Sequence, residues 1–188
     1  MTDPVASVSS KAVPGPLKAL GPVIQLAYFP TDFDAAMQYW IETVGVGPFF
    51  VLNDVKLGEM KYKGAPTDAV FTMAIGYWGD IQIELIKTDS TAPSLYHSEY
   101  AVRDQLHHVC VFVDDIKAAR AACAEAGAEV IVEGKVGEDG EVIYVDPGKG
   151  PGYVIEYLQP MAGSEGLFEM MKEAARNWDG SDPVRVLQ

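Results

Sequence analysis

The sequence predicts an α+β fold in which paired βαβββ modules form an incomplete barrel, with an added C-terminal helix. The first reason is a repeat: two apolar strands open with a polar side chain, Gln25 or His108, and each runs into an aspartate before an alanine-rich helix. The second is that residues 81–86 and 153–158 each place one glutamate inside an apolar strand. Because matched positions in a repeat are typical of duplicated units, we expect two modules that share one site.

The elements of the first module follow from local signals. A strand is expected at residues 23–29. Asp32 should cap a helix at residues 33–44, because its carboxylate can accept from the free N–H groups of the first turn. Gly45 and Gly47 should end that helix, since glycine adopts the left-handed terminating conformation at little cost. Three strands should then follow, the last two as a hairpin, at residues 49–55, 69–77 and 81–87.

The second module repeats this order in a shorter form. Asp114 or Asp115 should cap a helix at residues 116–126, which Gly127 ends. The first module carries extra residues between positions 53 and 68, expected to form a polar loop that serves as a lid or substrate rim. The strands of the second module are expected at residues 107–113, 129–136, 141–145 and 152–159.

The pattern changes after residue 160. Ser164 is expected to cap a helix at residues 165–177, followed by an extended tail at residues 178–188. This helix should pack across the back of the sheet or form a dimer seam, and a lid over the site is the alternative. The predicted organisation is a mobile arm, one domain made of two modules, and a C-terminal helix and tail: residues 1–20, 21–160 (modules 21–90 and 105–160) and 161–188.

Composition excludes several classes of function. Hydrophobic residues make up 48% of the chain, which is typical of a globular protein. The net charge of −13 argues against a surface that binds nucleic acid and disfavours strongly anionic substrates. No apolar run approaches the roughly 20 residues of a membrane span, and no export signal is seen. Only two cysteines are present, Cys110 and Cys123. These features predict a cytoplasmic protein whose cysteines are ordinary buried residues.

Four polar side chains form the candidate site. Gln25 and His108 occupy equivalent places in the two modules, as do Glu84 and Glu156, so pairing of the modules should bring all four into one concavity. A lone buried carboxylate costs several kcal/mol unless it is paired or binds a metal. One imidazole and three oxygen donors suit a divalent ion: Zn²⁺, Ni²⁺, Co²⁺, Mn²⁺ or Fe²⁺. The alternative is that each is an ordinary polar residue on a half-exposed strand.

The other two histidines have simpler interpretations. His107 should point to the opposite face of its strand and act structurally or behind the metal ligands. His97 lies in a polar connection and is expected to be exposed.

These residues resemble the vicinal oxygen chelate superfamily, which includes glyoxalase I, methylmalonyl-CoA epimerase, extradiol dioxygenases and bleomycin-resistance proteins. The resemblance covers about residues 21–159 and is closest to glyoxalase-like and epimerase-like members. It is carried by the strand–Asp–helix opening that ends in Gly45-Val46-Gly47-Pro48, and by Ile83-Glu84-Leu85-Ile86, Leu106-His107-His108-Val109 and Val154-Ile155-Glu156.

The resemblance implies a divalent metal held by Gln25, Glu84, His108 and Glu156. It also implies that Glu156 moves the proton, with Glu84 as ligand and catalytic partner. Gln25 stands where epimerases and bacterial glyoxalases usually have histidine. The third strand of the first module has no glutamate, whereas epimerases resemble one another in having one there, which disfavours two-base epimerisation of methylmalonyl-CoA.

Three functions remain open. The first is a metal-dependent lyase or isomerase that acts at a carbon α to a carbonyl through a metal-stabilised enolate. The second is a non-catalytic protein that binds a small molecule, as resistance-type relatives do. The third is an extradiol-type dioxygenase, which Gln25 disfavours because that chemistry needs two histidines and one carboxylate for Fe²⁺. In each case the partner is a small-molecule substrate or ligand, and the resemblance implies a homodimer.

Overall fold

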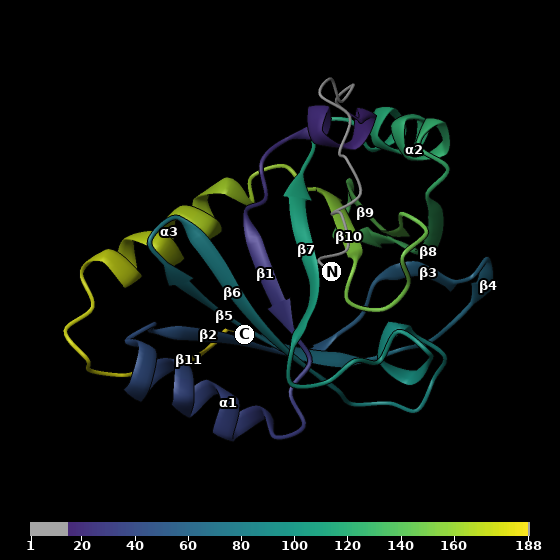
Figure 1. The fold of residues 1–188 in the computed structure, drawn as a ribbon. Helices are drawn as coiled ribbons and strands as arrows, with labels where there is room; N and C mark the ends of the chain where they lie inside the picture. The colour runs from purple at the N-terminus through teal and green to yellow at the C-terminus, as the bar shows by residue number, and fades with distance from the viewer. Residues whose placement is uncertain (1–14, 188) are drawn as a thin grey trace, which may run out of the picture.

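The computed structural model describes residues 15–187, and within them one mixed sheet of 11 strands carries the fold (Figure 1). The strand order is β11-β2-β5-β6-β1-β7-β10-β9-β8-β3-β4. The strands are β1 (Gln25–Tyr28), β2 (Phe49–Val55), β3 (Gly58–Tyr62), β4 (Ala65–Pro66), β5 (Phe71–Trp78), β6 (Ile81–Thr88), β7 (Leu106–Phe112), β8 (Glu129–Val136), β9 (Gly140–Asp146), β10 (Val154–Gln159) and β11 (Val184–Leu187).

The two predicted modules are joined through their first strands. In the first module, β1 pairs in parallel with β6, and in the second, β7 pairs in parallel with β10. Strands β1 and β7 then pair with each other in antiparallel fashion. The prediction of an α+β fold built from paired modules is therefore confirmed.

Two helices cover the outer face of this sheet. Helix α1 (Phe33–Tyr39) begins at Asp32, whose Oδ1 accepts from Ala35 N at 2.9 Å, and continues into a π-helical turn at Trp40–Val44. Helix α2 (Ile116–Glu125) begins at Asp115, which accepts from the first-turn N–H groups. Both caps match the predictions. The apolar side of α1 packs on alternate residues of β6, Ile83 and Leu85, which leaves the opposite face of β6 for the site.

Two segments expected to be irregular contain regular structure. Residues 1–14 of the predicted arm lie outside the described residues, but Pro16–Leu20 form a 3-10 turn whose Leu17 and Leu20 pack against α2 and its neighbours. The expected polar loop between positions 53 and 68 contains β3 and β4. Strand β3 pairs with β8, because the second module would otherwise leave that edge without a hydrogen-bonding partner. Only two residues separate β2, a strand of the first module, from β3, which pairs with β8 of the second module. The backbone between β2 and β3 therefore connects the two modules directly.

The third helix, α3 (Glu165–Arg176), lies over the concave face of the sheet, on the other side of β5 and β6 from α1 (Figure 1). Its Met171 is buried against Phe50, Ile75 and Tyr77. Ile75 is the cross-strand partner of Glu84, so the two side chains share a face. The expected packing across the sheet back is therefore wrong, and the alternative of a lid over the site describes the structure.

An ion pair from α3 and the strand that follows the helix connect it to the sheet. Lys172 Nζ lies 2.6 Å from Asp80 Oδ1 in the β5–β6 turn. Beyond the helix, the predicted extended tail forms β11, which pairs in parallel with β2 at the edge of the sheet. Ser164 precedes the helix as expected, but its hydroxyl makes no capping hydrogen bond. None of the helices among residues 15–187 has the length and apolar character needed to cross a membrane.

Candidate metal centre

The backbone register explains why distant residues converge. Ala27 on the central strand β1 is the cross-strand partner of Glu84 on one side and of His108 on the other. Its small side chain leaves space between them. On β10, Glu156 lies two residues beyond Val154, the partner of His108, and therefore points to the same face. Three strands thus present one donor side chain each to the concave side.

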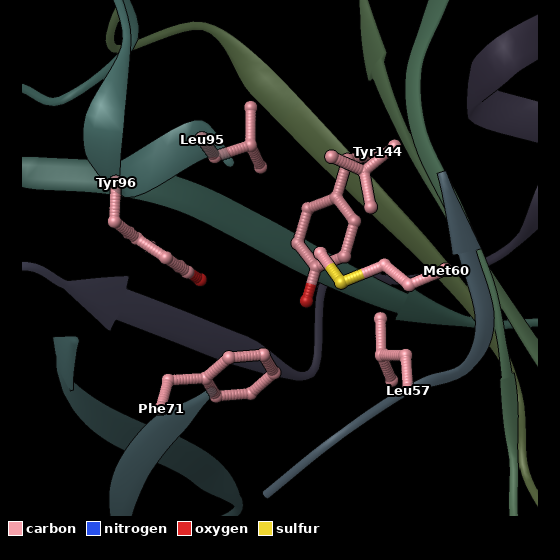
Figure 2. Close-up of a pocket in the computed structure, with 7 residues that line it drawn as sticks. Leu57, Met60, Phe71, Leu95, Tyr96 and Tyr144 are labelled. Atoms are coloured by element: carbon pink, nitrogen blue, oxygen red, sulfur yellow. The ribbon is translucent and has the colours of Figure 1, made fainter. Parts of the chain in front are cut away.

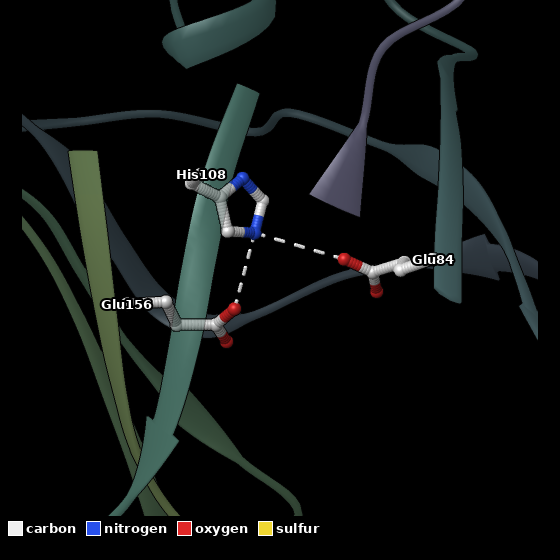
Figure 3. A group of neighbouring side chains, drawn as sticks. All are labelled: Glu84, His108 and Glu156. Atoms are coloured by element: carbon white, nitrogen blue, oxygen red, sulfur yellow. Dashed lines mark ion pairs between the residues drawn. The ribbon is translucent and has the colours of Figure 1, made fainter. Parts of the chain in front are cut away.

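The three side chains form a compact buried cluster (Figure 3). His108 Nε2 lies 3.2 Å from Glu156 Oε2 and 3.7 Å from Glu84 Oε2. One donor atom from each residue lies within 4.8 Å of the others. Donors about 2.1 Å from a common ion are about 3–3.4 Å apart, so the cluster is close to the spacing that a divalent ion requires. Glu84, His108 and Glu156 are 5%, 0% and 7% exposed, so the cluster is largely shielded from bulk solvent.

The electrostatics of the cluster favour a cation. Burial raises the pKa of Glu84 well above its ordinary value, and the negative charge of Glu156 raises it further. Two carboxylates held this close repel each other unless one is protonated or a cation lies between them. His108 Nε2 has no hydrogen-bond partner, because its contact with Glu156 lacks hydrogen-bond geometry. An orphaned ring nitrogen beside two carboxylates fits the donor set of a divalent metal.

Gln25 lines the same cavity as Glu84 and Glu156. Its Nε2 donates to Gln82 Oε1 at 3.0 Å, and Gln82 Nε2 in turn donates to the Tyr77 hydroxyl at 2.6 Å. These two hydrogen bonds leave Gln25 Oε1 buried without a partner. A buried amide oxygen with no donor is costly, and a metal ion would satisfy it. The structure therefore brings Glu84, His108 and Glu156 together, and it leaves Gln25 Oε1 unpartnered in the lining of the same cavity.

His107 lies directly behind the cluster. Its Nδ1 is 2.9 Å from Nδ1 of His108, and its ring packs against Phe29 and Tyr96. Burial and, to a smaller extent, the neighbouring His108 lower the pKa of His107 to about 3, so His107 is neutral near pH 7. A proton on His108 Nδ1 that is donated to His107 would leave His108 Nε2 free as a ligand. His97 is exposed, as predicted.

Residue-level reasoning missed Gln82 and Tyr144. Gln82 precedes Glu84 by two positions, so strand alternation alone could have placed it on the site face. Tyr144 is the cross-strand partner of Glu156, and its ring meets the His108 ring edge-on at 5.2 Å. Burial raises the pKa of Tyr144, as does the charge of Glu156. The pairing of β9 with β10 that brings Tyr144 to the site could not be read from local sequence.

A cavity of about 300 Å³ extends from the cluster toward α3. Polar residues gather at one end, where Gln25, Gln82, Glu84, Tyr144 and Glu156 line it. The remaining lining is almost wholly apolar: Leu52, Val55, Leu57, Phe71, Met73, Ile75, Phe112, Val136, Val142, Leu158, Pro160, Met161, Leu167, Phe168 and Met171, with Ser164 as the exception.

A smaller apolar pocket adjoins this cavity and shares Leu57, Phe71 and Tyr144 with it. Figure 2 shows the hydroxyl groups of Tyr96 and Tyr144 pointing into this pocket, opposite Phe71. Burial raises the pKa of Tyr96, and the charges of Glu84 and Glu156 raise it further. Both phenols therefore stay protonated near pH 7 and can donate hydrogen bonds.

Comparisons with known proteins agree with this architecture. A family model for the glyoxalase/bleomycin resistance protein/dioxygenase superfamily matches residues 24–145. A hypothetical protein from Bacillus halodurans C-125 has a similar solved structure: TM-score 0.52 and 15% identity, over 74% of this chain and 94% of that one. Methylmalonyl-CoA epimerase from Streptomyces coelicolor, solved with 2-nitronate-propionyl-CoA, gives a TM-score of 0.50 and 15% identity, over 76% and 99%. These structures show likeness of fold. No curated protein matches the sequence.

Proposed function

The chain belongs to the glyoxalase/bleomycin resistance protein/dioxygenase superfamily, and from this premise we propose that it is a metal-dependent lyase or isomerase acting at a carbon α to a carbonyl. The observation that carries the proposal is the buried cluster of Glu84, His108 and Glu156, with donor atoms within 4.8 Å of one another. Two buried carboxylates without a cation partner would destabilise the folded protein, because their desolvation would not be offset by an ion pair or a metal. Their placement at the polar end of a cavity supports a role in chemistry.

We assign four side chains to the ion: Gln25 through Oε1, Glu84 and Glu156 through carboxylate oxygens, and His108 through Nε2. A divalent ion held there would supply Lewis-acid stabilisation of negative charge that develops on the substrate's carbonyl oxygen. Zn²⁺, Ni²⁺, Co²⁺, Mn²⁺ and Fe²⁺ all suit one nitrogen and three oxygen donors.

Glu156 is our choice for the group that moves the proton. Its carboxylate would take the proton from the carbon α to the carbonyl, and the C–H electron pair would form a carbon–carbon double bond as the carbonyl π electrons move to oxygen. In a substrate whose α-carbon bears a hydroxyl, the same carboxylate would then return the proton to the former carbonyl carbon. The hydroxyl proton would pass to the former carbonyl oxygen, so the hydroxyl and carbonyl groups exchange places without an oxidant or reductant. Glu84 would act as a ligand of the ion that binds the reacting end of the substrate, and as the catalytic partner of Glu156.

The third strand of the first module supports a single proton-transfer group. Strand β5 presents Phe71, Met73 and Ile75 to the cavity, where a second acidic side chain would be required for proton transfer from the opposite side. This arrangement disfavours epimerisation by two bases and favours a proton shift on one face of the substrate.

The test is exchange of the α-proton in D₂O, followed by proton NMR. The probes are 2-hydroxyacetophenone and the hemithioacetal of methylglyoxal with glutathione, each with protein reconstituted with each divalent metal in turn. We expect metal-dependent deuteration of at least one probe and a loss of about 10²–10⁴-fold in Glu156→Gln. Glu141→Gln, on the neighbouring strand and outside the cavity lining, is the matched control. Exchange and metal content both unchanged in Glu156→Gln would refute the assignment.

A second function is favoured by the apolar lining of the cavity: sequestration of a small apolar molecule without catalysis. It predicts that the metal-free protein binds such a molecule with full affinity. The catalytic proposal predicts that affinity for a ligand with two neighbouring oxygens depends on the metal. An extradiol-type dioxygenase is the weakest choice, because the buried cluster described for residues 15–187 contains one histidine and two carboxylates.

We also propose that the protein is a homodimer of the cytoplasm. The location is supported by Cys110 and Cys123, both buried free thiols, as expected in a reducing compartment. The dimer is a proposal from the family resemblance, and light scattering coupled to size-exclusion chromatography tests it. A mass near the 20.4 kDa of one chain would contradict it.

A further inference from the structure

We infer that the site takes a compact, uncharged substrate with an apolar body and two neighbouring oxygen atoms at one end, and that it rejects phosphate-bearing substrates such as coenzyme A thioesters. This inference rests on the proposed function, because the two oxygens are those that would face the metal. It goes further by naming the chemical class of the substrate, and it sets this chain apart from the methylmalonyl-CoA epimerases whose fold it shares.

The cavity has a polar end and an apolar end. The polar donors gather around Glu84 and Glu156, and the rest of the wall is apolar. A substrate that keeps its oxygens at the donors must place the remainder of its structure against aliphatic and aromatic side chains. No lysine or arginine is among the residues described as lining this cavity. A charged group inside it would therefore lose hydration without gaining a partner.

Helix α3 covers the apolar part of the cavity. Phe168 packs against Phe112 of β7 with ring centroids 5.2 Å apart, and both rings line the cavity. Leu167 and Met171 complete the apolar surface of the helix toward the cavity. The volume of about 300 Å³ equals that of roughly ten water molecules at about 30 Å³ each in the liquid. A substituted benzene ring with a small chelating group is of this size, whereas the nucleotide of a coenzyme A thioester must remain outside.

A depression of about 240 Å³ adjoins the cavity beside α3. It shares Gln82, Phe112 and Phe168 with the cavity, so the two hollows are neighbours, and we take the depression as the approach to the site. Its charged residues are three carboxylates and one ammonium group: Asp80, Glu165, Glu169 and Lys172.

The cations near this approach are already engaged. Lys172 is paired with Asp80 at 2.6 Å, and Arg176 from outside the depression contacts Glu169 at 3.3 Å. Glu165 lies in the first turn of α3, where its carboxylate complements the positive end of the helix dipole. A phosphate group that remains outside the cavity would meet carboxylates here and no unengaged cation among the lining residues.

The experiment measures three hydroxamate probes by titration calorimetry on metal-loaded protein. Acetohydroxamic acid reports the two-oxygen group alone, benzohydroxamic acid adds an apolar ring, and 4-carboxybenzohydroxamic acid adds an anion to that ring. We expect benzohydroxamic acid to bind at least about tenfold more tightly than both others. Tenfold corresponds to about 1.4 kcal/mol, which is less than the burial of a benzene ring provides. Metal content is measured on the same samples after titration.

Two variants of α3 localise the effect. Phe168→Ser should reduce the preference for the aromatic probe to less than about threefold, because Phe168 lines the cavity. Met170→Ser, on the exposed side of the same helix, should leave the preference unchanged.

The outcomes separate the two proposals. If all three probes bind equally to metal-loaded protein, the substrate inference is overturned and the metal-dependent function stands. If the carboxylated probe binds as tightly as its parent, exclusion of anions is overturned. If the protein holds no metal and acetohydroxamic acid does not bind, the proposed function fails and the inference fails with it.

Discussion

Gln25 Nε2 donates a hydrogen bond to Gln82 Oε1 across 3.0 Å, and this contact leaves Gln25 Oε1 as the unpartnered atom of its amide. The counterpart of Gln82 in the second module is Val154, since each is the parallel partner of the first site residue, Gln25 or His108. The fold therefore accepts an apolar residue at this position. We explain Gln82 by its effect on Gln25. Its hydrogen bond orients the Gln25 amide so that Gln25 Oε1 stays free to bind a metal ion.

Gln82→Leu should therefore weaken metal binding without preventing folding. We expect a loss of about tenfold or more in affinity, because residues that orient metal ligands typically contribute this much. Competition titration against a fluorescent zinc chelator measures it. Gln38→Leu, at an exposed position on α1, is the matched control. Wild-type affinity in Gln82→Leu would show that Gln25 does not depend on this hydrogen bond.

Glu84→Gln should have opposite effects on the metal-free and metal-loaded protein. Burial and the charge of Glu156 raise the pKa of Glu84, so its carboxylate form destabilises the metal-free fold near pH 7. We expect the variant to raise the free energy of unfolding of metal-free protein by at least about 1 kcal/mol. The same change should lower the affinity for metal.

The pH dependence gives an internal check on the Glu84 prediction. A raised pKa means that the folded state holds the proton more tightly, so the wild-type protein loses stability as pH rises above the ordinary glutamate pKa. The gain in Glu84→Gln should therefore shrink as pH falls toward that value. Urea denaturation at several pH values measures both proteins, and a gain that grows at lower pH contradicts the account.

Met171→Ala should destabilise the protein by about 2–5 kcal/mol, because Met171 is 1% exposed and packs against Phe50, Ile75 and Tyr77. Its neighbour on the helix, Met170, is 42% exposed, and Met170→Ala should change stability by no more than about 0.5 kcal/mol. Thermal denaturation of the pair tests whether α3 is held on the concave face. Equal effects of the two substitutions would place the helix elsewhere.

Asp146→Asn should cost about 1–3 kcal/mol. Asp146 Oδ1 accepts from the backbone N–H groups of Gly148, Lys149 and Gly150, at 2.8, 2.8 and 3.0 Å, and Oδ2 accepts from the Tyr100 hydroxyl at 3.0 Å. Burial raises the pKa of Asp146, but these hydrogen bonds together outweigh it and the pKa is lowered. The stabilisation is thus present above the ordinary aspartate pKa and lost as pH falls through the lower, folded value.

The measurement for Asp146 is urea denaturation of both proteins between pH 7 and pH 3. The difference between wild type and Asp146→Asn should be largest at neutral pH and decline at the acid end. A constant difference across this range would mean that packing rather than the carboxylate charge accounts for the loss.

Much of the site could be predicted because strand alternation is a local rule. Once Gln25, Glu84, His108 and Glu156 are placed on strands of a duplicated fold, the facing direction of each side chain follows. The structure confirms that the paired modules share one concave face and that Glu84, His108 and Glu156 meet there. The assignment of all four residues as metal ligands stays a prediction.

The position of α3 could not be predicted for a physical reason. Its apolar residues define a stripe that must be buried, but a stripe does not specify which face of a sheet covers it. The choice is made by tertiary contacts: Met171 is buried against the concave face, and β11 adds to the edge of β2. Strand β3 was missed similarly, because its residues are largely polar and it forms only where the edge of β8 offers backbone partners.

The central claim is that four side chains from the two modules hold a single divalent cation, and metal stoichiometry tests it most directly. Elemental analysis by mass spectrometry is done on protein reconstituted and dialysed, for the wild type and for single alanine variants of Gln25, Glu84, His108 and Glu156. The account predicts about one equivalent of metal per chain in the wild type, near zero in the Glu84, His108 and Glu156 variants, and weakened retention in the Gln25 variant. A wild type without metal, or a His108 variant that keeps a full equivalent, would contradict it.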